Sequence, residues 1–123
     1  MQEKGPRLTR PKIIPDPTRL RRINGSFGWV DHRLLRDGHL EQIGPPQMAL
    51  YLFLVLAADR NGVSYYRLER ICKIVGFSED EFHAARDRLL ERGLIAFCPF
   101  TPKDVNGYYQ VLPLDSFSAN SRG

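Results

Sequence analysis

The spacing of apolar and polar positions along this chain predicts three main helices followed by two strands. An apolar stretch from Met48 to Ala58, entered through Gly44-Pro45-Pro46, predicts a first long helix over about residues 46–60. Because the stretch is apolar on every face, we expect the rest of the domain, or a second copy of it, to enclose this helix. Asn61-Gly62 is typical of the left-handed stop that follows a helix.

A second helix is predicted from an apolar stripe, with Ser64 as its N-cap and its end near Val75. The residues that form the stripe follow the i, i+3, i+4, i+7 spacing of one helix face: Leu68, Ile71, Cys72 and Val75. Gly76 closes the helix, and only the turn Gly76-Phe77-Ser78 separates it from the next one.

The third helix has the best-defined start in the chain. Ser78 and Glu81 have the S-x-x-E spacing of a capping box, and Phe77 and Phe82 have the spacing of a hydrophobic staple. Gly93 predicts an end at about Arg92.

Two strands are predicted after the helices, and a third before them. Residues 94–97 and 108–112 are apolar runs separated by a ten-residue stretch with two prolines and Asn106-Gly107, so we expect a β-hairpin. Residues 26–30 predict a short N-terminal strand. Asp31 then caps a single helical turn over residues 32–36, which ends at Asp37-Gly38; a tight Asp-Gly hairpin is the alternative.

Composition and charge divide the chain into an arm, a domain and a tail. The 123 residues suffice for one small domain, with 18 Lys and Arg against 14 Asp and Glu. Residues 1–36 hold nine basic and three acidic residues, whereas residues 37–123 hold nine and eleven. We therefore expect a basic, proline-punctuated arm over 1–26 that is extended or disordered, a domain over 27–113 and a loose tail over 114–123. Such asymmetry indicates a polyanionic partner.

Several classes of protein are not expected. The polar N-terminus lacks an export signal, which predicts a cytoplasmic protein, and the longest apolar run has eleven residues, far short of the roughly 20 of a membrane span. Cys72 and Cys98 do not have the spacing of zinc ligands, and the three histidines (His32, His39, His83) are too scattered to complete a site, so we expect no metal. We expect both cysteines to be reduced thiols in the core. No phosphate loop, nucleophile motif or paired carboxylates appear, so neither an enzyme nor a cofactor is expected.

The predicted order of helix, short turn, capped helix and hairpin is that of a winged helix-turn-helix, an α+β fold of three main helices and a β-hairpin wing. From Phe27 to Leu112 the chain resembles the winged helix-turn-helix modules of phage and plasmid replication initiators and replisome organisers, including the DnaD type. The segments that carry the resemblance are Phe27 to Leu35, Ala49 to Leu54, Ala58 to Val63, Gly76-Phe77-Ser78 and Leu89 to Ile95.

The resemblance implies that the third helix lies in a DNA major groove and that the wing contacts phosphates. The candidate contact residues of the helix are Ser78, Glu79, Asp80, His83, Arg86 and Asp87, and those of the wing are Phe100, Lys103 and Asn106. The helix departs from the usual pattern because it begins with three acids, which phosphates repel and which also suit a first helical turn. Arg86 is either a snorkelling arginine at the core edge or one directed at a partner. His83 is either solvated or base-reading.

The stronger candidate for DNA contact is the basic arm. Its arginines and lysine would neutralise phosphates or enter a minor groove, and two arginines of the short turn would extend the surface into the domain. These residues are Arg7, Arg10, Lys12, Arg19, Arg21, Arg22, Arg33 and Arg36. A solvated tail is the alternative interpretation.

The sequence thus predicts a DNA-binding protein of a phage, plasmid or other mobile element, acting in replication initiation or transcription regulation on double-stranded DNA. The alternative is a protein–protein adaptor in a larger nucleoprotein complex, docked through the acidic third helix. A homodimer is a further expectation, paired through the first helix and through the arm and short strand that precede it.

Overall fold

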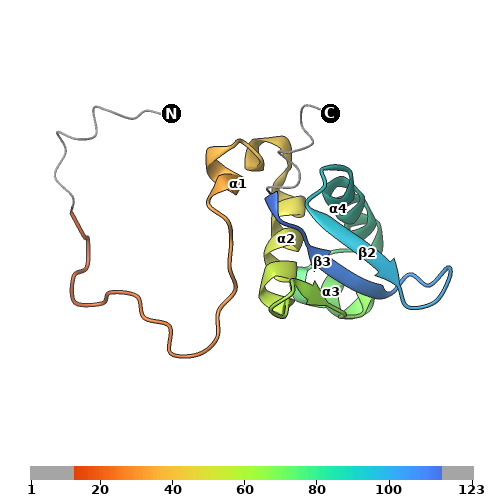
Figure 1. Cartoon of the computed structure of the whole chain (residues 1–123), viewed down its shortest axis with the longest axis horizontal. Helices are drawn as coiled ribbons and strands as arrows, with labels where there is room; N and C mark the ends of the chain where they lie inside the picture. The colour runs from red at the N-terminus through yellow and green to blue at the C-terminus, as the bar shows by residue number, and fades with distance from the viewer. Residues whose placement is uncertain (1–12, 115–123) are drawn as a thin grey trace.

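The computed structural model describes residues 13–114 and has a small α+β fold (Figure 1). Three main helices, a short lone strand and a β-hairpin make up the domain, in an arrangement consistent with a winged helix. The helices are α2 (Pro45–Ala57), α3 (Leu68–Val75) and α4 (Glu79–Glu91), preceded by one turn of helix, α1 (Arg33–Arg36), and a 3-10 turn (Leu40–Gln42). The strands are β1 (Val63–Ser64), β2 (Ile95–Pro99) and β3 (Gly107–Val111).

One three-stranded antiparallel sheet lies against the helices. Its order is β1-β3-β2, so β3 is the central strand and pairs with both neighbours. In Figure 1 the hairpin lies in front of the helices, so the outer face of the sheet is turned toward the viewer. The layer between sheet and helices holds the core, whose largest fully buried side chains are Phe82, Leu50, Leu54, Ile71, Leu89 and Leu94.

The helix-turn-helix between α3 and α4 is as predicted. Gly76 ends α3 with a φ of 85°, and its N–H and that of Phe77 both donate to the carbonyl of Cys72. At the start of α4, Glu81 N–H donates to Ser78 Oγ over 3.1 Å and Ser78 N–H donates to Glu81 Oε1 over 2.7 Å. The capping box is therefore confirmed at both of its hydrogen bonds.

The start of α3 differs from the prediction. Ser64 is not an N-cap, because its backbone lies in β1, opposite Tyr109 of β3. The N-cap is Arg67, whose side chain makes no capping bond. Instead, Asn106 Oδ1, which is 38 residues away, accepts a hydrogen bond of 2.7 Å from Leu68 N–H. The wing thus caps a helix that its own sequence leaves uncapped.

The expected N-terminal strand at residues 26–30 is wrong. These residues form no strand, and Phe27, Trp29 and Val30 are largely exposed. The segment passes beside the end of α2, where a Cβ on Gly28 would lie 3.2 Å from the Val55 carbonyl. A strand needs a partner edge, and here the neighbouring element is a helix. A single helical turn follows as expected, although α1 begins at Arg33 and not at His32: Asp31 Oδ1 accepts from Arg33 N–H, α1 ends at Arg36 with Asp37 as its C-cap, and Gly38 has a φ of 81°.

Two predicted core features are only half right. Helix α2 ends at Ala57 and buries Leu50, Tyr51, Leu54 and Val55, but it leaves an exposed stripe at the i, i+4, i+8 positions Met48, Leu52 and Leu56. The domain alone does not enclose α2, and a homodimer stays a prediction. Both cysteines are free thiols; Cys72 is buried as expected, whereas Cys98 is exposed because β2 turns it to the outer face of the sheet.

Candidate nucleic-acid interface

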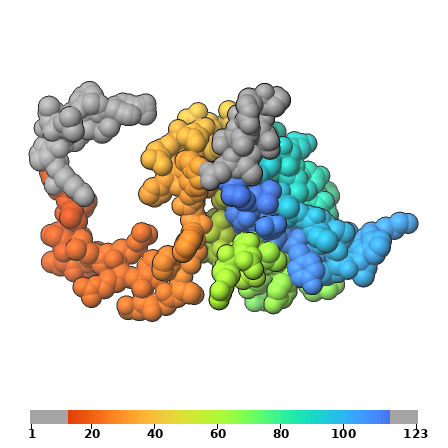
Figure 2. Space-filling view, viewed as in Figure 1, coloured from red at the N-terminus to blue at the C-terminus, as the bar shows by residue number. Residues whose placement is uncertain are grey.

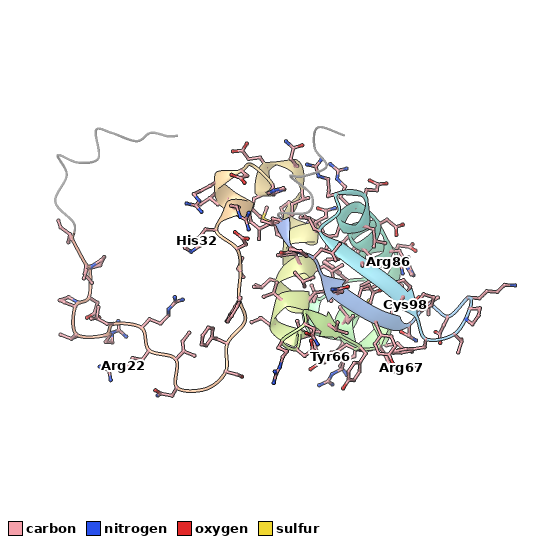
Figure 3. All side chains as sticks on the ribbon, in the orientation of Figure 1. Arg22, His32, Tyr66, Arg67, Arg86 and Cys98 are labelled. Carbon is pink, nitrogen blue, oxygen red and sulfur yellow. The ribbon has the colours of Figure 1, made fainter. Side chains whose placement is uncertain are left out.

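The described part of the basic arm, residues 13–26, lies clear of the domain. Residues 13–26 follow an extended course away from the body (Figure 2), and Arg22 points away from it in Figure 3. Arg19 donates to Asp16 Oδ2 over 2.7 Å, and the hydrogen bonds that Thr18 and Arg19 donate hold the pKa of Asp16 below its ordinary value. Arg21 and Arg22 are exposed, and no ion pair joins them to another described residue. Arg7, Arg10 and Lys12 lie outside the described residues.

The two arginines of α1 differ in whether a carboxylate binds their guanidinium group. Arg33 donates from Nε and Nη2 to both carboxylate oxygens of Asp31, over 3.1 and 2.5 Å. These hydrogen bonds lower the pKa of Asp31 to about 2, so the pair stays ionised at any pH near neutral. Arg36 is exposed on the same turn. Of the two, Arg36 is therefore the one that offers an unengaged guanidinium to a phosphate.

Helix α4 presents an acidic face to solvent. The exposed residues include five acids, Glu79, Asp80, Glu81, Asp87 and Glu91, against one arginine, Arg88, which donates to the Gln42 carbonyl. His83 is half-buried, with its ring edge-on to Phe82 at 5.6 Å. Ser78 is occupied by the capping box. A phosphate backbone would therefore meet repulsion along this face.

Arg86 lies at the edge of the core. Its guanidinium carbon is 5.4 Å from the centre of the Phe97 ring and 5.9 Å from that of Phe82, and its side chain is only 17% exposed. Figure 3 shows it beside β2, where its Nε donates to Asp87 over 3.3 Å. Of the two interpretations left open by the sequence, this geometry favours the core-edge arginine, held by cation–π contacts.

The same cluster contains a buried hydroxyl. Tyr109 is 3% exposed, its ring packs on Phe97 at 4.7 Å, and its hydroxyl has no hydrogen-bond partner among the described residues. Burial raises the pKa of Tyr109, with Arg86 acting in the opposite direction, so the phenol stays protonated at neutral pH.

The three predicted wing residues have different surroundings. Asn106 is 5% exposed and caps α3, so its side chain is part of the fold. Lys103 is exposed in the loop that projects from the domain and has a φ of 73°. Phe100 is 37% exposed and packs edge-on against Tyr108 at 5.0 Å. Lys103 is thus the single predicted wing residue with a free positive charge.

Two groups of exposed residues lie outside the predicted DNA contacts, except for Phe100 of the wing. One is a row of rings on the outer face of the sheet, formed by Tyr65, Tyr108 and Phe100. The other is the basic side of α3, with Arg67, Arg70 and Lys73 exposed. A period-2 count outward from the buried Tyr109 would have assigned Tyr108 to the solvent face. The pairing with Tyr65 had no sequence signal, because it depends on a two-residue strand.

Other kinds of site find no support in the described part of the chain. No three His, Cys, Asp or Glu side chains within residues 13–114 gather closely enough to hold a metal ion. Over the same residues, no helix is both long and apolar enough to cross a membrane. Comparison with protein-family models, with curated proteins and with solved structures gives no match to this chain.

Proposed function

We propose that this protein binds double-stranded DNA through its basic arm and catalyses no reaction, and that it acts in replication initiation or transcription regulation of a phage, plasmid or other mobile element. The observation that carries the proposal is the separation of charge: exposed arginines on the arm, and an acidic exposed face on α4. The helix-turn-helix arrangement and the family resemblance support the choice of DNA as the polyanion. In this proposal the domain positions the arm, and the arm supplies most of the affinity.

The salt dependence of binding tests the arm directly. In the full chain, Arg21→Gln with Arg22→Gln is expected to lower affinity for a 20-base-pair duplex about tenfold and to reduce the slope of log K against log salt by about 2, since each lost phosphate contact removes about 0.9. Fluorescence anisotropy at several salt concentrations measures both quantities.

The matched control removes two arginines from the body, Arg60→Gln with Arg92→Gln, and should leave the slope within about one contact of the wild type. An arm variant with an unchanged slope would contradict phosphate contact by the arm. Absence of any duplex binding at low salt would overturn the proposed function as a whole.

A second candidate function is favoured by the acidic face of α4. A winged helix that docks on a protein through this face would be an adaptor within a nucleoprotein complex, with its arm on nucleic acid. Reversing two charges, Glu79→Lys and Asp80→Lys, distinguishes the two roles of α4. Neither side chain is needed for the capping box, so the fold should persist.

For an adaptor, the reversal should tighten duplex binding several-fold, because two repulsive charges become attractive, while the protein loses its activity in the cell. For a groove-reading helix, the same change should instead weaken discrimination between duplex sequences. Competition binding with two unrelated duplexes, paired with a cellular assay, separates these results.

A further inference from the structure

The outer face of the sheet presents aromatic side chains to solvent where a small domain would ordinarily present polar ones. Along β3 the side chains alternate, so Tyr109 is buried while Tyr108 is 48% exposed on the opposite face. The strand register places Cys98 of β2 beside Tyr108 on that face. Figure 3 labels Cys98 at the end of the hairpin from which the wing loop projects.

Three rings form a row across this face. Tyr65, just after β1, packs edge-on against Tyr108 with 6.1 Å between ring centres, and Tyr108 packs edge-on against Phe100 at 5.0 Å. Their exposed fractions are 65%, 48% and 37%. The planes meet at 76° and 90°, so the edge of one ring meets the face of the next and each contact takes up only one ring face. The row therefore keeps exposed aromatic surface at three successive positions.

The sheet face between the rings carries no charge, and an exposed cation follows each end of the row in the sequence. The remaining outward residues of the three strands are Val63, Ala96, Cys98 and Gln110. Arg67 is two residues after Tyr65 and lies near the start of β3, because the next residue donates its N–H to Asn106. Lys103 is three residues after Phe100, in the wing loop.

The acids next to these cations weaken them little. Asp104 is half-buried and accepts from Asn106 N–H over 2.8 Å. Glu69 approaches Arg67 to 3.8 Å, but both side chains are mostly exposed, and exposed pairs of this kind are weak. Arg70 and Lys73 continue the positive charge along the exposed side of α3.

We propose that this sheet face is a binding site for single-stranded nucleic acid, in which unpaired bases stack on Tyr65, Tyr108 and Phe100 while Arg67 and Lys103 contact the phosphates. Bases in a duplex stack on each other and expose only their edges, so the exposed faces of these rings can stack on bases only once the bases are unpaired. The flanking cations match a polyanion better than they match an apolar protein surface. This second site accepts a different form of nucleic acid from the duplex assigned to the arm.

Cys98 supplies a reporter within the site. Its thiol is exposed beside Tyr108, whereas Cys72 is buried and burial raises the pKa of its thiol, which makes it the slower to alkylate. We expect a 12-residue oligothymidylate to slow maleimide labelling of Cys98 in the full chain at least fivefold. An abasic phosphodiester oligomer of equal length, and a 12-base-pair duplex, should give little protection. Mass spectrometry of the intact protein measures the labelling.

Substitutions separate stacking from charge. Tyr65→Ala and Tyr108→Ala should each weaken oligothymidylate binding about fivefold or more, because one stacked base is lost. Tyr108→Phe, which keeps the ring, should retain binding even if the alanine variant folds poorly. Tyr66→Ala is the matched control: Tyr66 is 41% exposed, but its ring packs on Phe53 at 5.1 Å, away from the row.

Several results would overturn the site. These are wild-type affinity in folded Tyr65→Ala and Tyr108→Ala variants, equal protection by the abasic oligomer, or oligothymidylate binding that leaves Cys98 fully reactive. The arm variant Arg21→Gln with Arg22→Gln should lose duplex affinity yet keep protection of Cys98 by oligothymidylate. Failure of the stacking site and failure of the arm are therefore measured separately.

Discussion

Replacing Gly107 with alanine is expected to destabilise the domain by about 3 kcal/mol or more, the largest effect we predict for a single methyl group in this chain. Gly107 begins β3 opposite Pro99, and a Cβ there would lie 2.6 Å from Pro99 Cα and 2.8 Å from the Cys98 carbonyl carbon. Both neighbours are backbone atoms of the paired strand, so relief requires the hairpin to separate. For a domain of this size the loss lowers the melting temperature by more than about 10 °C.

The cause is space rather than backbone conformation. Gly107 is not among the glycines with positive φ, so an alanine would suffer no torsional penalty there. Gly25→Ala is the matched control, because a Cβ at Gly25 meets nothing within 4 Å and should change the free energy of unfolding by less than about 0.5 kcal/mol. Urea denaturation followed by circular dichroism compares the two. A Gly107→Ala protein with the wild-type midpoint would mean that the strands pair in another register.

The second large effect is expected at Asn106. Asn106→Ala should destabilise the domain by about 2–3 kcal/mol, because the buried N–H of Leu68 loses its only cap and the wing loses its attachment to α3. The side chain is 5% exposed, so water does not readily replace it. Chemical denaturation gives the loss, and amide hydrogen exchange at Leu68 should quicken markedly.

Two further variants define the interaction at Asn106. Asn106→Asp keeps the accepting oxygen next to a helix start and should recover part of the stability. Asn61→Ala removes an exposed asparagine side chain and should change stability by less than about 0.5 kcal/mol. If the Asn106 and Asn61 variants were equally stable, the long-range cap would contribute nothing measurable to the fold.

The elements fixed by neighbouring residues were predictable from the sequence. The start of α4 was placed to the residue, because both capping bonds join residues three apart. The hairpin, the turn at Gly76 and the short helix after Asp31 were predicted for the same reason. In each case the residues that decide the structure are a few positions apart along the chain.

The elements fixed by distant residues were not predictable. Strand β1 has two residues and exists because β3 offers it an edge, with Tyr109, 45 positions later, opposite Ser64. Once β1 forms, Ser64 is unavailable as a cap and Asn106 takes that role. The strand expected at residues 26–30 has suitable residues but lies beside α2 instead of an edge. The β-propensity of a residue describes how well it suits a strand, but a strand forms only where a partner edge is available for pairing.

In the candidate site, too, features set by nearby residues were predictable and features set by distant residues were not. Charge placed by sequence position alone separated the basic arm from acidic α4, and the exposure of Arg21, Arg22, Glu79 and Asp80 agrees with that separation. Arg86 stayed ambiguous because a helical wheel gives its direction but does not show that the Phe97 ring of β2 lies against it. Of the aromatic row, only Phe100 was a predicted contact, because the packing of Tyr65 on Tyr108 joins residues 43 positions apart that no local pattern connects.

The arm described above gives the protein a long reach. Residues 13–26 span about 45 Å when fully extended, which exceeds one turn of B-DNA, about 34–36 Å. A domain resting on nucleic acid would hold its arm at a local concentration in the millimolar range over more than a full turn of the helix. Each contact could then release and reform while the other persists, so the protein would pass between neighbouring DNA segments without dissociating.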